Sequence, residues 1–212
     1  MARYDRLLDE GAAHSPARHD FHHLSRIPSG NFRFVALDVE TACGNSASIC
    51  QIGLACVGHD NQIQTFSMMV DPAMHFDAFN IRLHGIGPDH VQGAPRFPQA
   101  LAALLPLLSE HLIIQHSTFD SAAFAAAYAH HNIDPPALRW ANSVSIARRA
   151  WPELKGHGGH GLASLKQVLG LRFHHHDAGE DARAAAMVVL RAEAHLTLQL
   201  DDLIAPAKKA RA

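Results

Sequence analysis

The sequence is poor in charged residues, in cysteine and in long apolar runs. Charged residues make up 18% of its 212 positions and the formal net charge is −2, so no general attraction to polyanions is expected. Three closely spaced cysteines, Cys43, Cys50 and Cys56, do not form a disulfide framework. The longest apolar run, residues 101–108, is too short to span a membrane. With no secretory signal visible, these absences predict a reducing, cytoplasmic location without membrane contact.

The chain contains enough apolar residues for a sizeable core. They make up 48% of the sequence, within the range of roughly 45–50% for globular proteins, and the length favours one domain with additional termini. We expect an N-terminal extension over residues 1–30, a folded main domain over residues 31–200 and a short basic tail over residues 201–212.

The hydrophobic pattern predicts strands first and helices later. Strands are expected at residues 34–37, 49–57, 62–70 and 112–114. Helices are expected at residues 97–108, 119–131, 143–151, 162–169 and 178–200. Three strands followed by an alternation of helix and strand predict an α/β domain with a mixed sheet.

Two carboxylates close the first expected strand. Asp38 and Glu40 are two positions apart, so both side chains project from the same face. Adjacent like charges repel each other unless a cation lies between them, and carboxylate oxygens suit Mg²⁺ or Mn²⁺. The alternative interpretation is a solvated strand end.

A third carboxylate, Asp120, follows the strand at residues 112–114 and opens a helix. Its spacing from Ser117 fits a capping box, so taken alone it is explained as a cap partner. A carboxylate in the first helical turn is also favoured by the helix dipole, and the roles of cap and metal ligand can coexist.

The segment that opens the longest expected helix is the most informative. Asp177 is predicted to cap this helix, with Glu180 as its reciprocal partner. Asp181 then lies at the helix start, and His176 lies just outside it, where it can point into a cleft. Alone, each has a simpler explanation, because Asp181 can be a solvated helix residue and His176 one of 18 histidines.

The order of these motifs resembles the DEDDh branch of the 3′–5′ exonuclease superfamily, which includes the epsilon proofreading subunit of bacterial DNA polymerase III, ribonuclease T and oligoribonuclease. The similarity runs from Phe34 to about Ala194. Its motifs are residues 34–41, 116–120 and 176–182, and residues 83–86 resemble the family's His-Gly-Ile element. Ser117 stands where the family often has Asn, and Asn142-Ser143 where it often has Asp-Thr.

The resemblance implies a ribonuclease H-like fold, with a mixed five-stranded sheet flanked by helices. It also implies two divalent cations, Mg²⁺ or Mn²⁺, held by Asp38, Glu40, Asp120 and Asp181. These ions supply the positive charge at the scissile phosphate, so the protein need not be basic. His176 is the implied general base, a role that an imidazole pKa near 6.5 suits. The neighbours His174 and His175 are its rivals.

The implied activity is 3′–5′ exonucleolytic release of 5′-mononucleotides from single-stranded or frayed DNA by two-metal-ion hydrolysis. Thr41, His84, Ile86 and Phe119 are expected substrate contacts, since single-strand binders combine aromatic stacking with a phosphate track. Ordinary packing is the alternative for these residues.

Other functions stay open at this point. No residue decides between DNA and RNA, so an exoribonuclease or oligoribonuclease is an alternative, as is an inactive nuclease-like module that binds nucleic acid. Residues 199–203 faintly resemble a sliding-clamp-binding peptide, but the same residues can simply complete a helix. Association with a polymerase or a sliding clamp is therefore undecided.

Overall fold

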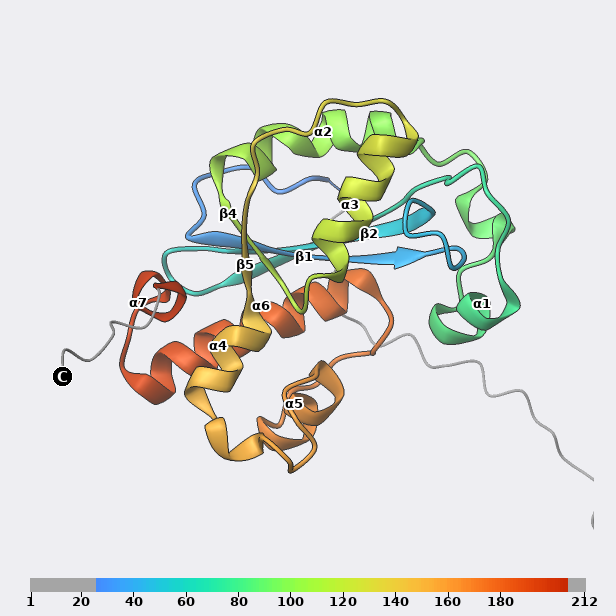
Figure 1. Ribbon diagram of the computed structural model, residues 1–212. Coiled ribbons are helices and arrows are strands. Elements are labelled where there is room, and N and C mark those ends of the chain that lie inside the picture. Colours follow the sequence, from blue (N-terminus) through green and yellow to red (C-terminus); the bar gives the residue numbers. More distant parts are fainter. Residues whose placement is uncertain (1–25, 206–212) are drawn as a thin grey trace, which may run out of the picture.

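A mixed five-stranded sheet runs through the centre of the computed structural model (Figure 1), which describes residues 26–205. The strand order is β3-β2-β1-β4-β5, and β1 pairs antiparallel with β2 and parallel with β4. The strands are β1 (Phe34–Thr41), β2 (Ile49–Val57), β3 (Ile63–Met69), β4 (Leu112–Gln115) and β5 (Arg139–Asn142). This arrangement confirms the predicted α/β fold. Most of the expected N-terminal extension and of the basic tail lies outside the described residues.

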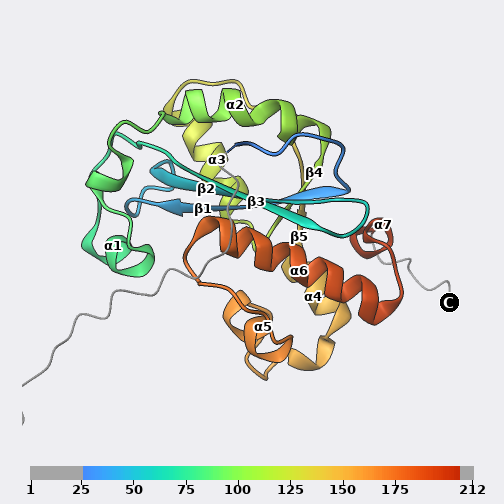
Figure 2. The same ribbon diagram turned by 180° about the vertical axis from the view of Figure 1, so that it is seen from behind.

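Helices cover both faces of this sheet (Figures 1 and 2). Two of them, α2 (Phe97–Glu110) and α3 (Phe119–His130), lie on one face. The opposite face carries α4 (Ser143–Ala150), α5 (Leu162–Val168) and α6 (Ala178–Leu196). Two short helices, α1 (Ala78–His84) and α7 (Leu200–Ile204), lie at opposite ends of the sheet. Among the described residues, no helix is both long and apolar enough to cross a lipid bilayer.

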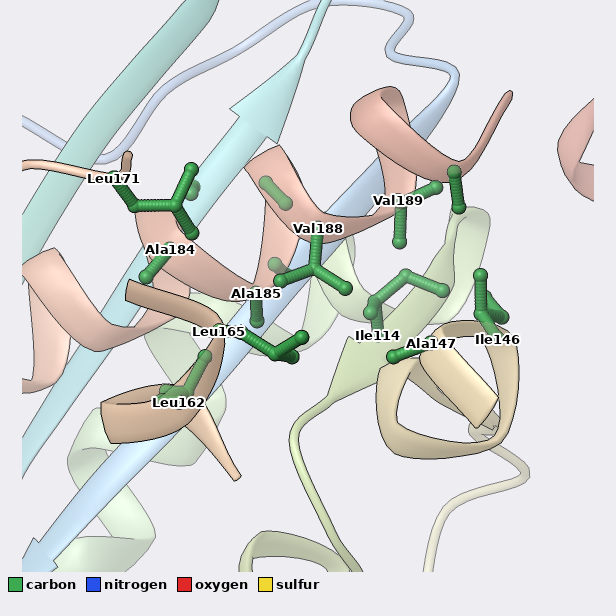
Figure 3. Close-up of a cluster of buried hydrophobic side chains, with 14 of the residues drawn as sticks. Ile114, Ile146, Ala147, Leu162, Leu165, Leu171, Ala184, Ala185, Val188 and Val189 are labelled. Carbon is green, nitrogen blue, oxygen red and sulfur yellow. The ribbon is translucent and has the colours of Figure 1, made fainter. Parts of the chain in front are cut away.

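The alternation of β1 determines which side chains face which layer. Val35 and Leu37 belong to the apolar cluster under α2 and α3, whereas Phe34 and Ala36 belong to the cluster under α6. Figure 3 shows part of this second cluster, in which Val188 of α6 lies near Ile114 of β4. Because β1 is buried on both faces, its sequence is a continuous apolar run. Asp38 and Glu40 continue the row of Phe34 and Ala36, and therefore face α6.

The N-terminus of α6 rests directly on β2. A Cβ atom on Gly53 would lie 2.0 Å from the carbonyl carbon of Ala178, so only glycine permits this approach. Gln51 Oε1 accepts a hydrogen bond from the Ala178 N–H at 3.1 Å. Asp177 accepts one from the Glu180 N–H at 3.1 Å, which confirms Asp177 as the helix cap. The Glu180 side chain, its expected reciprocal partner, accepts a hydrogen bond from the His174 N–H. These contacts carry Asp181 to the sheet.

The C-terminal helix is shorter than expected. It ends at Leu196 because Thr197 adopts a left-handed conformation with φ 54°, and the short α7 follows. Leu200 and Leu203 of α7 are buried in the same cluster as α6. Residues 199–203 therefore contribute Leu200 and Leu203 to the core, as the helical alternative predicts.

Candidate active site

A cavity of about 800 Å³ opens where β1 ends. It is lined by residues of β1, by the first turn of α3, by the start of α6 and by the loop before α6. Seven residues that the sequence assigns to the site line it together: Asp38, Glu40, Thr41, Phe119, Asp120, His176 and Asp181. Residues that are more than 140 positions apart in the chain thus share one cavity.

The carboxylates meet at the floor of this cavity. Asp38, Glu40 and Asp181 each offer an oxygen atom, and these three atoms all lie within 4.8 Å of one another. Asp120 is fixed by β1, since its Oδ1 accepts a hydrogen bond from the Val39 N–H at 3.1 Å. The expected capping box of α3 is wrong: Thr118 is the N-cap and its side chain makes no capping hydrogen bond. Asp120 is bound to the strand instead.

Burial, together with repulsion between neighbouring carboxylates, raises the pKa values of Asp38, Glu40 and Asp120. Desolvation, followed by repulsion from Asp181 and Asp120, raises the pKa of Glu40 to about 8. Desolvation raises the pKa of Asp120 to about 7, and with repulsion from Asp120 it raises that of Asp38 well above its usual value. None of the described residues lining the cavity is a lysine or arginine. Several hard oxygen donors without a cationic side chain form a donor set that fits a divalent ion such as Mg²⁺ or Mn²⁺.

Two consecutive histidines stand beside Asp181. The Nδ1 atom of His175 lies 2.9 Å from Asp181 Oδ2, and the His176 ring stacks on the His175 ring with centroids 4.0 Å apart. The His176 backbone N–H also donates to Asp181 Oδ2 at 2.9 Å. Desolvation and the neighbouring His175 lower the pKa of His176. Both rings line the cavity, and the side-chain contact with Asp181 belongs to His175.

The expected substrate contacts are divided between the cavity and the core. Phe119 lines the cavity and is 46% exposed. The carbonyl oxygen of Thr41 lies 3.1 Å from His84 Nε2, but His84 is not part of the lining. Ile86 is buried in an apolar cluster with Ala42, so it supports the end of β1 from behind.

Several residues of the cavity were not assigned a role in the site from the sequence. His116 is held between Ser143 Oγ at 2.8 Å and the His160 carbonyl oxygen at 3.0 Å, and burial lowers its pKa to about 4. Phe79 and Leu83 of α1 line the cavity although they are 65% and 41% exposed. The spacing of these two apolar residues by four was the available signal for a short helix with one apolar face.

Asn142, which stands where the family often has Asp, also has a structural role that the sequence analysis did not predict. Its Oδ1 accepts hydrogen bonds from the Val144 N–H at 2.8 Å and the Ser117 N–H at 3.3 Å. One amide side chain thus caps α4 and holds the loop between β4 and α3. An asparagine can do this as an aspartate would.

Comparisons with known proteins agree with this geometry. The sequence model of the exonuclease family RNase T matches residues 35–189. The chain is 30% identical over 161 residues to the PolC-type DNA polymerase III of Streptococcus thermophilus, covering 74% of this chain and 11% of that protein. It is 31% identical over 194 residues to that of Streptococcus pneumoniae, covering 84% and 13%. The chain thus spans about a tenth of the length of these curated relatives.

Solved nuclease structures share the fold. Exonuclease X in complex with 5′-overhanging duplex DNA has a TM-score of 0.63 and 18% identity, covering 81% of this chain and 97% of that one. The nuclease domain of 3′hExo, described as a DEDDh family member and bound to rAMP, has a TM-score of 0.63 and 19% identity, covering 77% and 93%. Exonuclease I has a TM-score of 0.67 and 15% identity, covering 82% and 42%.

Proposed function

Because this chain belongs to the RNase T family of exonucleases, within the DEDDh 3′–5′ exonuclease superfamily, we propose that it trims single-stranded or frayed DNA from the 3′ end and releases 5′-mononucleotides. The observation that carries the proposal is the convergence of Asp38, Glu40 and Asp181, beside the strand-bound Asp120, in one open cavity. The preference for DNA rests on the relatives, which are DNA polymerases.

The carboxylates are the proposed ligands of two divalent ions. Asp38, Glu40, Asp120 and Asp181 would hold them, and Mg²⁺ or Mn²⁺ fits the all-oxygen donor set. When bound, such a pair of ions stabilises the attacking and leaving oxygens of an in-line displacement. The raised pKa values of Glu40 and Asp120 support this assignment, because they reflect burial first and then repulsion from Asp181, and a bound cation offsets both effects.

His176 is the proposed general base. It takes one proton from the water that attacks the terminal phosphodiester, and the bond from phosphorus to the 3′-oxygen of the preceding nucleotide breaks. The strand regains a 3′-hydroxyl by taking a proton from solvent, and the product leaves as a 5′-mononucleotide. His175, whose ring stacks on that of His176 and contacts Asp181, is the alternative base, and single substitutions distinguish the two.

The residues expected from the sequence to contact the substrate are proposed to hold the terminal nucleotide, directly or through their neighbours. Phe119 presents an exposed aromatic ring on which a base can stack. Thr41, at the end of β1, lies beside the metal ligand Glu40, and His84 contacts the Thr41 carbonyl oxygen. Ile86 is proposed to act indirectly, through the packing behind Thr41.

A primer labelled at its 5′ end, with a paired or mismatched 3′ terminus, tests the proposal. We expect a ladder that shortens from the 3′ end in the presence of Mg²⁺ or Mn²⁺ and stops with a chelator. The mismatched primer should be trimmed faster, because unpairing a terminal base costs a few kcal/mol. The same oligomer in RNA shows whether the enzyme is an exoribonuclease.

Two matched controls complete this experiment. The Asp38→Asn variant should leave the primer intact while it keeps the native circular dichroism spectrum. A circular single strand has no 3′ end and should also stay intact. Cleavage of the circle would demonstrate endonuclease action, and the absence of cleavage of any linear substrate with either metal would favour an inactive nucleic-acid-binding module.

A further inference from the structure

A second group of potential metal ligands lies at the rim of the cavity, apart from the four carboxylates. Cys43 follows β1, while His75 and Asp77 precede α1, and each offers one ligand atom. The sulfur, nitrogen and oxygen atoms all lie within 4.8 Å of one another. Cys43 and Asp77 line the cavity, and α1 stands beside the end of β1 in Figures 1 and 2.

Backbone contacts already hold the two segments in register. The Asp77 N–H donates to the Ala42 carbonyl oxygen at 2.8 Å, and the Gly44 N–H donates to Asp77 Oδ2 at 3.1 Å. The other oxygen of this carboxylate, Oδ1, lies 3.3 Å from His75 Nε2. Two ligands at about 2.0–2.1 Å from a tetrahedral ion are separated by about 3.3 Å. His75 and Asp77 therefore already have the separation of two zinc ligands.

The ligand types differ from those of the cavity floor. The floor offers carboxylate oxygens, which suit Mg²⁺ and Mn²⁺, whereas a thiolate with an imidazole selects Zn²⁺ and similar ions. We propose that Cys43, His75 and Asp77 form a separate site for Zn²⁺ that ties the loop after β1 to the segment before α1. Binding releases the thiol proton to solvent, and a water or a substrate oxygen completes the tetrahedral coordination.

The two other cysteines do not compete for this role. Burial raises the pKa of Cys50 and of Cys56 to about 12, so both thiols stay protonated at neutral pH. Cys56 belongs to the apolar cluster under α2 and α3, which makes it a suitable control position. His75 is 76% exposed at its side chain, so it can move toward the sulfur and can be replaced without loss of packing.

The site would position α1. This helix contributes Phe79 and Leu83 to the cavity wall, yet it buries none of its residues. Side-chain contacts of Asn80 and His84 with the Thr41 carbonyl oxygen tie it to the end of β1. A metal ion bound at Asp77, immediately before the helix, adds a cross-link to β1 at the point where the wall of the cavity begins. Zn²⁺ would thus set the width of the substrate entrance without joining the carboxylate cluster.

Titration with Co²⁺ tests the site in the untagged full-length protein. Co²⁺ can replace Zn²⁺ in such sites, and its complexes, unlike those of Zn²⁺, absorb visible light. Excess Mg²⁺ is present to occupy the carboxylates. We expect one equivalent of Co²⁺ to produce a sulfur-to-cobalt charge-transfer band, and stoichiometric Zn²⁺ to abolish it. Cys43→Ser should remove the band. His75→Ala should weaken Co²⁺ binding by at least about 10-fold, since even indirect ligand partners contribute about 10–100-fold.

Matched variants separate this site from the catalytic one. Glu40→Gln, which removes a carboxylate of the floor, and Cys56→Ser should both retain the band. The proposal is overturned if the wild-type protein shows no sulfur band, if the band survives Cys43→Ser, or if His75→Ala binds Co²⁺ as tightly as wild type. Loss of the band in Glu40→Gln would assign the metal to the carboxylate cluster. Because no outcome depends on nuclease activity, failure of this site leaves the proposed function untouched.

Discussion

The same two elements, β1 and α6, meet at both of their ends, and their charges are arranged in opposite ways. At one end, Arg33 immediately before β1 forms an ion pair with Glu193 near the end of α6, at 2.5 Å. At the other end, Asp38 and Glu40 of β1 face Asp181 of α6 without a lysine or arginine among the described cavity residues. At the first end, Arg33 neutralises Glu193. At the second end, no lysine or arginine among the described residues of the cavity lining is available to pair with the carboxylates.

This difference separates stability from function. A partly buried ion pair whose partner is removed leaves an unpaired charge and is strongly destabilising. Removing one of several repelling carboxylates instead relieves repulsion. The paired end therefore holds the two elements together, while the unpaired end lowers the stability of the fold in the absence of a cation.

The largest expected effect is at the unpaired end. Asp38→Asn should lower kcat by about 10³-fold or more, because metal ions contribute several kcal/mol of transition-state stabilisation and each 1.4 kcal/mol is tenfold in rate. In chelator, the same variant should melt at a higher temperature than wild type. Primer degradation and thermal unfolding measure the two effects. A variant that keeps a near-native rate with Mg²⁺ would refute the metal assignment.

The general base gives the next largest effect. His176→Ala should lower kcat by about 10²–10⁴-fold, as expected for a general base, with little change in the metal concentration needed for half-maximal activity. His175→Ala is the matched control, since its ring stacks on His176 and contacts Asp181. The reverse result, with His175→Ala inactive and His176→Ala nearly silent, would assign the base to His175.

At the paired end, stability should change and activity should not. Glu193→Gln leaves Arg33 without its carboxylate, and we expect a loss of about 3 kcal/mol in the free energy of unfolding. Urea denaturation measures this loss, and the rate of primer trimming at a temperature well below unfolding should match wild type. The double variant Arg33→Met with Glu193→Gln should recover part of the stability. Loss of activity in folded Glu193→Gln would break the distinction between the two ends.

Only part of the unpaired end follows from a short-range rule. The i, i+2 spacing of Asp38 and Glu40 predicts a common face, whereas the meeting of Asp120 and Asp181 with them was implied by the resemblance of the ordered motifs to the DEDDh exonucleases. The apolar runs likewise predicted the central strands. What brings α6 onto the sheet, however, is the missing side chain of Gly53 against Ala178. An isolated glycine in a strand indicates a close approach but not its partner.

Other features could not be predicted because they depend on contacts between distant segments. The capping box expected at Asp120 follows from local spacing, but the carboxylate bonds instead to Val39, 81 positions away. The helix α1 has no buried residue, and its apolar face consists only of Phe79 and Leu83, which is a weaker signal than the longer apolar stripe by which amphipathic helices are recognised. The backbone of His176 is left-handed, φ 69°, so the directions of the His175 and His176 rings do not follow from spacing alone.

The pH dependence of stability provides a smaller test of the unpaired end. Glu40 has an ordinary pKa of 4.5 and a folded-state pKa of about 8, so the unfolded state loses this proton first as the pH rises. Without metal, the contribution of Glu40 to the free energy of unfolding should therefore be fully present below pH 4.5 and should be lost as the pH rises toward 8. Melting curves in chelator should show this fall. Mn²⁺ should raise the melting temperature most at the alkaline end, and Glu40→Gln should flatten the profile.

The smallest expected effect concerns the aromatic wall of the cavity. Phe119 is 46% exposed, so Phe119→Ala should leave the fold intact. It should raise KM for single-stranded DNA by at least about 5-fold, because stacking of one base contributes about 1 kcal/mol or more. Val168, an apolar residue of α5 that is 51% exposed and lies outside the cavity lining, is the matched control, and Val168→Ala should leave KM unchanged. Steady-state trimming of a labelled oligonucleotide measures both. If Phe119→Ala instead lowers kcat and leaves KM unchanged, the ring positions the neighbouring Asp120 and does not hold the base. In that case the catalytic part of the cavity includes the first turn of α3.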